Sequence, residues 1–251
     1  SGTIYRLANH GYSYDESYSQ RYYPTAALEL VEMLSDLSRL NDEPSIPSDS
    51  ANRTTVYMES PVLQPGILPN GAHYNSSLEG FDGSFLGVIG YIRNSLQYAV
   101  TKGNISLEEA KAIGIKYIAM NQPLFIASTY KTPDNLWIDG VRIQSPQWTI
   151  EEVAMRAATA LFTAKQILGP YDPGLRFADI EPLPYVTATQ VDTWVKAFNN
   201  AAISLGLRGD DAKLAFFQAD VVWGRPGWQT NLQEISTILQ QNNIPLNIII
   251  N

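Results

Sequence analysis

The sequence predicts an α/β chain in which strands and helices alternate, and three observations support this fold class. Hydrophobic residues make up 45% of the 251 residues, enough for a large buried core. The strand candidates are near-continuous apolar runs, as in strands buried on both faces of a parallel sheet. Most strand candidates are preceded or followed by a segment of helical period. We therefore expect a (β/α) TIM-type barrel, with an open doubly wound parallel sheet as the alternative.

The expected elements follow one another in a regular order. The expected strands cover residues 3–8, 54–59, 116–121, 175–181, 213–220 and 246–251. The expected helices cover residues 25–40, 85–100, 107–114, 150–168, 188–205 and 230–241. Two long segments, 41–84 and 121–147, are rich in turn-forming residues and are expected to be loops, which at this length usually carry function.

The sequence predicts where three helices start and which face is buried in two of them. A capping box, in which a hydroxyl and a carboxylate or amide three residues later satisfy free backbone N–H groups, is expected at three helix starts. These boxes pair Ser106 with Glu109, Thr149 with Glu152, and Thr187 with Gln190. Apolar stripes mark the faces expected to pack on the sheet. They comprise Val153, Ala157, Leu161, Ala164 and Leu168 in one helix, and Val191, Trp194, Val195, Phe198, Ala201 and Ala202 in the next.

The two ends of the sequence shape the expected domain organisation. The last residues, 246–251, form an apolar strand, and a domain rarely ends on a core strand. We therefore expect one barrel-like catalytic domain over residues 1–251, cut short at its C-terminus before a seventh and an eighth strand.

Composition excludes several partners and sites. The net charge is −8, and the 17 Lys and Arg residues are spread along the chain, so a nucleic-acid partner is not expected. No apolar run approaches the roughly 18 residues of a membrane span. Without cysteine, neither disulfides nor thiolate metal ligands nor a cysteine nucleophile can form. With only His10 and His73, a histidine-rich zinc site cannot be built, and we expect neither a metal nor a cofactor.

Polar residues stand where each apolar strand ends. In parallel α/β folds, catalytic residues come from these strand ends and from the loops that follow. We therefore expect these polar side chains to gather into one site at the carboxyl ends of the strands. Its candidate members are His10, Glu59, Asn121, Gln122, Asp179, Glu181, Tyr185, Gln218, Asp220, Trp223 and Asn251.

The strongest candidates are Asp179 and Glu181. They are two residues apart, so on a strand their side chains point to the same face, with Cα atoms roughly 6.6 Å apart at about 3.3 Å per residue. Two carboxylates this close raise one pKa, which makes one of them an acid near neutral pH. This favours Glu181 as general acid or base, with Asp179 holding or polarising it. The alternative is that the two cap the next turn or pair with Arg176.

Asp220 is the expected third carboxylate, because its strand would neighbour that of Glu181. Gln218 and Asp220 share a face, and Trp223 follows as a possible stacking platform for a sugar ring. Glu59 is a fourth candidate from another strand end. Asp179, Glu181 and Asp220 could instead form an all-oxygen Mg²⁺ or Ca²⁺ site.

Carboxylates with aromatic residues at a barrel mouth are typical of glycosidic bond cleavage. The segment Phe177-Ala178-Asp179-Ile180-Glu181-Pro182 resembles the Asp-x-Glu strand end of barrel glycoside hydrolases, both chitinase-like enzymes and barrel muramidases. This resemblance implies that Glu181 is the proton donor and Asp179 its partner. It covers the strand order and one tripeptide.

The leading hypothesis is a carbohydrate-active hydrolase that cleaves oligo- or polysaccharides and acts outside the cell or after export. The first alternative is a non-catalytic carbohydrate-binding or surface-assembly protein on the same fold. The second is a divalent-metal phosphoesterase or lyase that uses the same carboxylates. The sequence leaves open the sugar, its linkage, retention or inversion at the anomeric carbon, and the oligomeric state.

Overall fold

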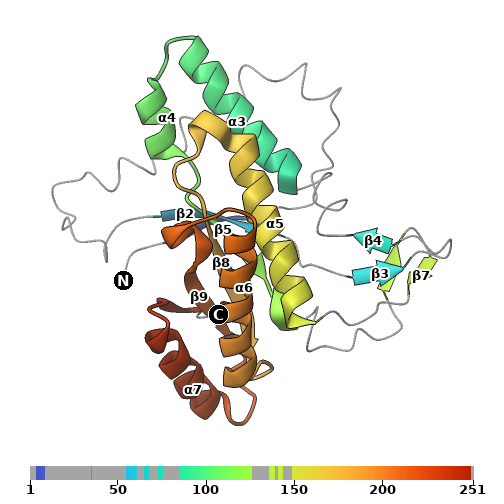
Figure 1. Ribbon diagram of the computed structural model, residues 1–251. Coiled ribbons are helices and arrows are strands. Elements are labelled where there is room, and N and C mark those ends of the chain that lie inside the picture. Colours follow the sequence, from blue (N-terminus) through green and yellow to red (C-terminus); the bar gives the residue numbers. More distant parts are fainter. Residues whose placement is uncertain are drawn as a thin grey trace. The chain divides into compact units, whose positions relative to one another are not determined.

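The computed structural model describes residues 4–8, 35, 55–60, 65–67, 73–75, 85–125, 136–138, 141–143 and 149–249. It shows an α/β chain with parallel strands, which confirms the predicted fold class (Figure 1). The chain divides into two compact units whose segments interleave along the sequence. The first unit takes residues 1–59, 81–118 and 163–175, and the second takes the remaining segments.

In the first unit, strands β1 (Ile4–Ala8) and β2 (Thr55–Ser60) pair in parallel. Helices α3 (Phe85–Thr101) and α4 (Leu107–Ile113) both contact the short 3-10 helix η3 (Gly169–Tyr171). Apolar side chains of these elements make the core of the unit. Ile89, Leu96 and Ala110 are fully buried there.

Four parallel strands form a sheet in the order β5 (Tyr117–Asn121), β8 (Arg176–Leu183), β9 (Leu214–Val221) and β10 (Leu246–Ile249), and the last three lie wholly in the second unit. Helix α5 (Ile150–Leu168) precedes β8, α6 (Ala188–Ser204) and the 3-10 helix η4 (Gly209–Ala212) lead into β9, and α7 (Trp228–Gln241) leads into β10. These boundaries all lie within two residues of the predicted ones. The strong periodicity of the helices explains that agreement.

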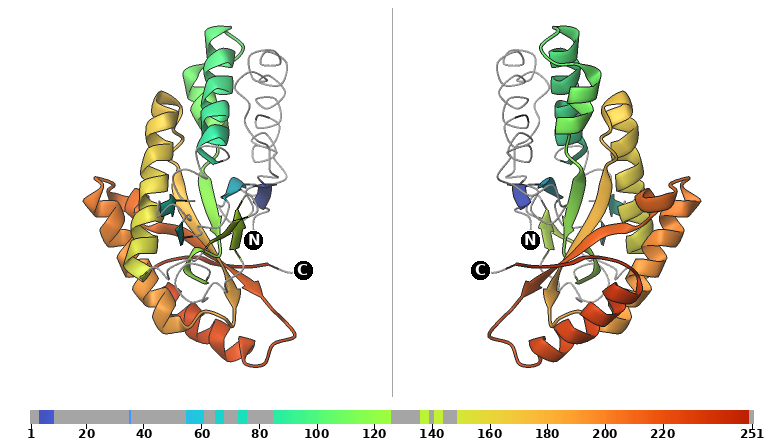
Figure 2. Two further views of the ribbon diagram at one scale, coloured as in Figure 1. Left: turned by 90° about the vertical axis from the view of Figure 1, so that its right-hand side faces the viewer. Right: turned by 90° about the vertical axis from the view of Figure 1, so that its left-hand side faces the viewer.

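Helix α6 lies along one face of β8 and β9 (Figure 2). The rings of Phe177 on β8 and Phe198 on α6 stack with centroids 4.8 Å apart, and Trp194 lies 6.1 Å from Phe198. Phe177, Trp194 and Phe198 are fully buried. The apolar stripes predicted on α5 and α6 are both buried, so their assignment to the core is confirmed.

All three predicted capping boxes form. At the start of α6, the backbone N–H of Gln190 donates to Thr187 Oγ1, and the N–H of Thr187 donates to Gln190 Oε1. Ser106 with Glu109 and Thr149 with Glu152 make the same reciprocal pair of bonds. Because each box satisfies two N–H groups that the helix leaves free, local sequence alone fixes these helix starts.

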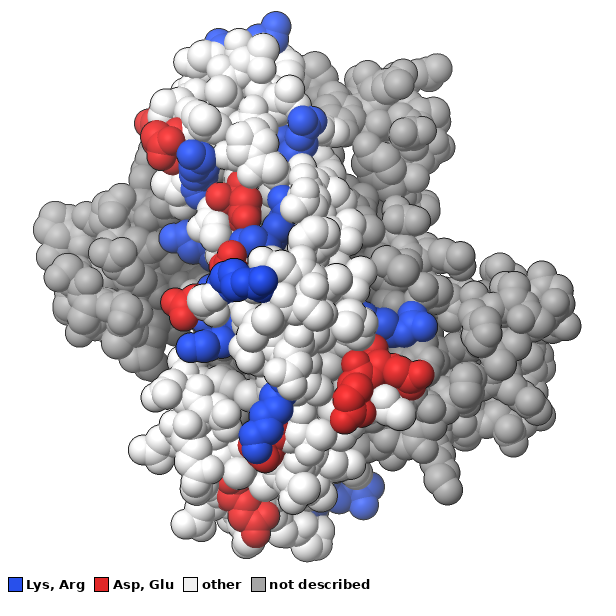
Figure 3. Space-filling view, viewed as in Figure 1, with Lys and Arg blue, Asp and Glu red and all other residues white. Residues whose placement is uncertain are grey.

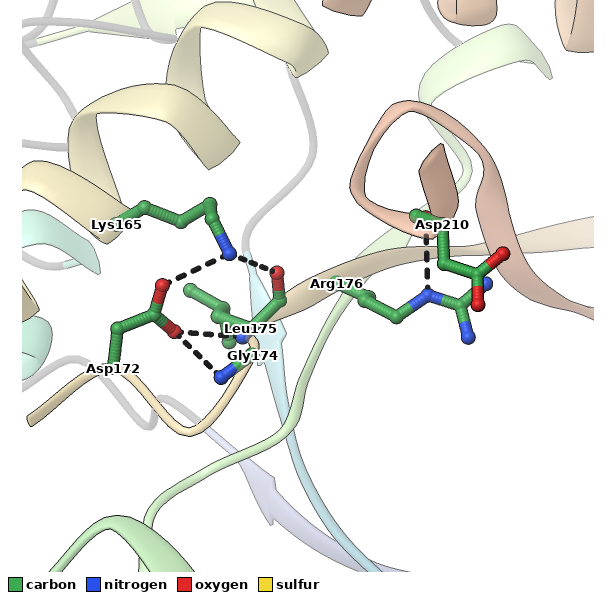
Figure 4. Close-up of polar contacts among 6 residues, drawn as sticks. All are labelled: Lys165, Asp172, Gly174, Leu175, Arg176 and Asp210. Carbon is green, nitrogen blue, oxygen red and sulfur yellow. Dashed lines mark hydrogen bonds and ion pairs between the residues drawn. The ribbon is translucent and has the colours of Figure 1, made fainter. Parts of the chain in front are cut away.

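The turn that leads into β8 is held by an ion pair (Figure 4). Lys165 Nζ lies 2.9 Å from Asp172 Oδ2 and donates to the carbonyl of Leu175 at 3.1 Å. Asp172 Oδ1 also accepts the backbone N–H groups of Gly174 and Leu175. The carboxylate of Asp172 is therefore fully compensated by one cation and two backbone donors.

Some sequence expectations need correction. The long segments 41–84 and 121–147 contain two antiparallel hairpins, β3 (Pro65–Ile67) with β4 (His73–Asn75) and β6 (Leu136–Ile138) with β7 (Val141–Ile143). These strands are three residues long, too short for a pattern to reveal them. Strand β10 is not the buried strand that its apolar run predicted, because it lies at the end of the sheet order and Ile248 is 43% exposed.

Three further expectations concern the helix over residues 25–40, closure of the sheet into a barrel, and membrane spans. Of the predicted helix over residues 25–40, the structure describes Ser35 alone, which is helical. The described strands form a parallel sheet, and a closed barrel is not seen among them. Among the described helices, none is both long and apolar enough to cross a membrane. Acidic and basic side chains are intermixed on the face drawn in Figure 3.

Candidate functional site

The candidate site centres on Asp179 and Glu181, two fully buried residues of strand β8. In the register with β9, Asp179 pairs with Phe217 and Glu181 pairs with Ala219. Alternation along β8 puts both carboxyl groups on the same face as Phe177. Since Phe177 stacks on Phe198 of α6, the pair lies on the face of the sheet that α6 covers.

Glu181 holds the chain segment that follows the neighbouring strand β5. The backbone N–H of Leu124 donates to Glu181 Oε1 at 2.6 Å, and that of Phe125 donates to Oε2 at 3.0 Å. Gln122 adopts a left-handed conformation (φ 57°), and its N–H donates to the carbonyl of Ile180 at 2.6 Å. A helical turn then begins at Pro123. Glu181 thus satisfies first-turn N–H groups that have no partner within a helix.

Asp179 lacks such compensation. Among the described residues, neither of its carboxyl oxygens has a partner at hydrogen-bond geometry, and the indole Nε1–H of the fully buried Trp194 also has no acceptor there. Trp194 and Glu181 are nevertheless close enough to Asp179 to affect its pKa. Arg176 does not neutralise the pair, because its Nε donates to the carbonyl of Asp210 (Figure 4). A buried polar group without partners costs about 1–3 kcal/mol, so this one calls for an explanation.

Burial sets the protonation of the pair. Loss of solvation raises the pKa of Asp179 to about 8, against smaller lowering contributions from Glu181, Trp194 and the N–H of Ile180. Loss of solvation and then the charge of Asp179 raise the pKa of Glu181 well above its usual range, although the N–H groups of Leu124 and Phe125 oppose this. Two carboxyl groups in one dry site cannot both ionise cheaply, so the pair retains a proton at neutral pH.

The structure does not bring Asp220 together with the pair. In the register, Asp220 pairs with Pro182 and Gln218 pairs with Ile180, so both side chains point to the face opposite Asp179 and Glu181. The sequence placed Asp220 in the correct strand but could not give the register, which decides the face. Among the described residues, no three His, Cys, Asp or Glu side chains are grouped as metal ligands. The expected donor set for Mg²⁺ or Ca²⁺ is therefore not assembled there.

Two of the predicted aromatic residues lie at the carboxyl ends of these strands. Tyr185 follows β8 and is 39% exposed, while Trp223 follows β9 and is 42% exposed. The ring of Phe125, which Glu181 positions through the backbone, lies 5.3 Å from that of Tyr185. Exposed aromatic rings at this edge of a parallel sheet are where a ligand would be expected.

The remaining predicted residues are placed in part. Asn121, at the end of β5, and Gln122 are half-buried, and Gln122 contributes its backbone to the site. Glu59 lies on β2 in the first unit. His10 and Asn251 lie outside the described residues.

Sequence reasoning missed three contributors to the site. Leu124 and Phe125 act through their backbone N–H groups, for which no side-chain pattern gives a signal. Trp194 was assigned to the apolar stripe of α6, where its indole N–H was a usable clue: a buried donor needs an acceptor. No protein-family model matches this chain, and a search of curated proteins finds no relative.

Proposed function

We propose that this protein is a carbohydrate-active hydrolase that cleaves glycosidic bonds. The carrying observation is the pair of fully buried carboxyl groups of Asp179 and Glu181 on one face of β8, where burial raises the pKa of both. A carboxylic acid that stays protonated there is what a leaving glycosidic oxygen requires.

In the proposed reaction, Glu181 gives its proton to the glycosidic oxygen while the bond from that oxygen to the anomeric carbon breaks. Water then gives its hydroxyl to the anomeric carbon. It attacks either directly, with a second carboxylate taking its proton, or after that carboxylate has bonded to the carbon, in which case water displaces the carboxylate and Glu181 takes the proton. Asp179 acts through Glu181, because its charge and proton set the protonation of the donor. Glu181 is bonded to the N–H groups of Leu124 and Phe125 and is fully buried, so the proposal includes release of the turn at 123–125 when substrate binds.

That same burial favours a second candidate function, a non-catalytic carbohydrate-binding or surface-assembly protein. Both oxygens of Glu181 are engaged by backbone donors, as expected of a carboxylate that supports a loop. In this case the ligand would rest on the exposed rings of Tyr185 and Trp223. The buried pair would then only shape the surface beneath them.

Purified protein, assayed for release of reducing ends from a panel of neutral and acidic polysaccharides, separates the two candidates. Hydrolysis by the wild type that falls about 10²-fold or more in Glu181→Gln supports the first, since general acid catalysis contributes 10²–10⁴-fold. The rate should also fall as pH rises through the folded pKa of the donor. Asp192→Asn, which changes a half-buried carboxylate on α6 that pairs with Lys196, is the matched control and should be unaffected.

Folding of each variant is verified by its thermal midpoint, and Asp179→Asn serves as a second test. This variant should change the pH profile of the rate, because Asp179 raises the pKa of Glu181. Binding without turnover in the wild type would contradict the hydrolase and leave the binding protein.

A further inference from the structure

The loops after β8 and β9 carry three exposed residues, Tyr185, Trp223 and Arg225, and the half-buried Trp228 at the start of α7 lies against them; we call these four residues the aromatic–arginine patch. The N–H of Val222 donates to the carbonyl of Leu183, which ties the two loops together. The N–H of Tyr185 and that of Arg225 each close a turn within their own loop. The patch is therefore held in shape by backbone hydrogen bonds and needs little ordering when a ligand binds.

The rings of the patch are oriented by one another. Trp223 and Trp228 meet edge to face with centroids 4.7 Å apart, so the exposed indole of Trp223 is braced from behind. Tyr185 is braced by Phe125 at 5.3 Å. Braced, exposed rings offer a flat apolar surface for the C–H face of a sugar ring.

Arg225 adds a positive charge to this surface. Its Cζ lies 5.5 Å from the ring centroid of Tyr185, a cation–π contact that orients the guanidinium without using its N–H donors. In the part of the chain that the structure describes, no carboxylate forms an ion pair with Arg225. A planar, oriented guanidinium with available donors matches a carboxylate through two parallel hydrogen bonds.

We propose that the aromatic–arginine patch is a subsite for an acidic sugar, a hexuronic acid residue whose ring stacks on the exposed aromatic rings while its carboxylate pairs with Arg225. This inference rests on the proposed carbohydrate function and names its substrate class. It also explains how a chain of net charge −8 could hold a polyanionic saccharide: the recognition is local and geometric.

Titration calorimetry with oligogalacturonides and with neutral galactose oligosaccharides of equal length tests the subsite. The acidic oligomer should bind at least about tenfold more tightly, as expected for a charge-assisted bidentate pair, and more weakly as salt rises. Arg225→Gln should remove this advantage, so that the acidic and neutral oligomers bind with similar affinity. Arg225→Lys should keep part of this advantage, because lysine retains the positive charge but lacks the planar guanidinium that makes two parallel hydrogen bonds.

Lys102→Gln is the matched control, because Lys102 also lies over an aromatic ring, at 5.7 Å from that of Tyr98, and its loss removes the same charge. Its binding should equal that of the wild type. Equal affinity for the acidic and neutral oligomers, or no effect of Arg225→Gln in a folded variant, would overturn the subsite.

The two proposals fail in different ways. Acidic oligomers that bind through Arg225 without being cleaved would leave the subsite standing and remove the hydrolase. Cleavage of neutral polysaccharides that depends on Glu181 and not on Arg225 would do the reverse. Absence of binding to any saccharide would overturn both.

Discussion

Asp172 and Asp179 are close in the sequence, but their carboxyl groups have opposite environments. Asp172, just before β8, has a lysine and two backbone N–H groups as partners. Asp179, inside β8, is fully buried, and its oxygens have no hydrogen-bond partner in the part of the chain that the structure describes. The partners of Asp172 stabilise the fold. The burial of Asp179 without such partners costs free energy, so a role in stability does not account for its position.

The largest expected effect lies in the pH dependence of stability, which Asp179 should dominate. Its folded pKa of about 8 exceeds the unfolded value of about 3.9, so between these values the native state holds a proton that the unfolded state has lost. The free energy of unfolding should therefore fall as pH rises from about 4 to about 8, by up to roughly 1.4 kcal/mol per pH unit. Urea titrations over this range measure it.

Asp179→Asn is the matching variant, and it should flatten that slope by about one proton's contribution. Glu181, whose pKa is also raised by burial, should supply the slope that remains. An unchanged slope in Asp179→Asn would show that Asp179 does not hold the proton.

Removal of the compensated carboxylate gives the next largest effect. Asp172→Ala removes the carboxylate that faces the mostly buried Lys165 and leaves the N–H groups of Gly174 and Leu175 without their acceptor, so it should cost about 2–4 kcal/mol at neutral pH. The control Asp210→Ala should stay within about 0.5 kcal/mol, because Arg176 bonds to the backbone carbonyl of Asp210. Equal costs for the two variants would contradict the assigned role of Asp172.

A smaller effect is expected from Glu181→Gln. The amide NH₂ of glutamine cannot accept a hydrogen bond, so one of the N–H groups of Leu124 and Phe125 would face a donor, at a cost of about 1–3 kcal/mol. Glu109→Gln is the control: Glu109 accepts the N–H of Ser106 in an exposed capping box, where glutamine serves equally well. Thermal unfolding of both variants measures the difference, and equal losses would count against the burial argument.

The smallest effect belongs to Asp220. It is half-buried on the opposite face from Glu181, so Asp220→Asn should lower the thermal midpoint less than Glu181→Gln does. A loss as large as that of Glu181→Gln would mean that Asp220 supports the pair, contrary to the register.

The sequence predicted the parts of this fold that depend on local pattern. Capping boxes such as that of Thr187 and Gln190, and apolar stripes such as that of α6, are local and were confirmed. It also placed Asp179 and Glu181 on one face of a strand with a raised pKa. What it could not give is which face, since that depends on the pairing of β8 with β9 and on the packing of α6.

The support beneath the pair could not be predicted for the same reason. Leu124 and Phe125 lie 57 and 56 residues from Glu181 and contact it through backbone groups that every residue carries. The left-handed conformation of Gln122, which turns the chain toward Glu181, has no marker in a residue of this type. Contacts between distant segments appear only once the strands are in register.

The central claim is that the pair of Asp179 and Glu181 keeps a proton at neutral pH. Carbon-13 NMR of the side-chain carboxyl groups, followed from pH 4 to pH 10 in the wild type and assigned with Asp179→Asn, tests it directly. The claim predicts an Asp179 carboxyl signal that stays in its protonated position at pH 7 and titrates near pH 8. A signal that has already moved to the ionised position by pH 5 would contradict it.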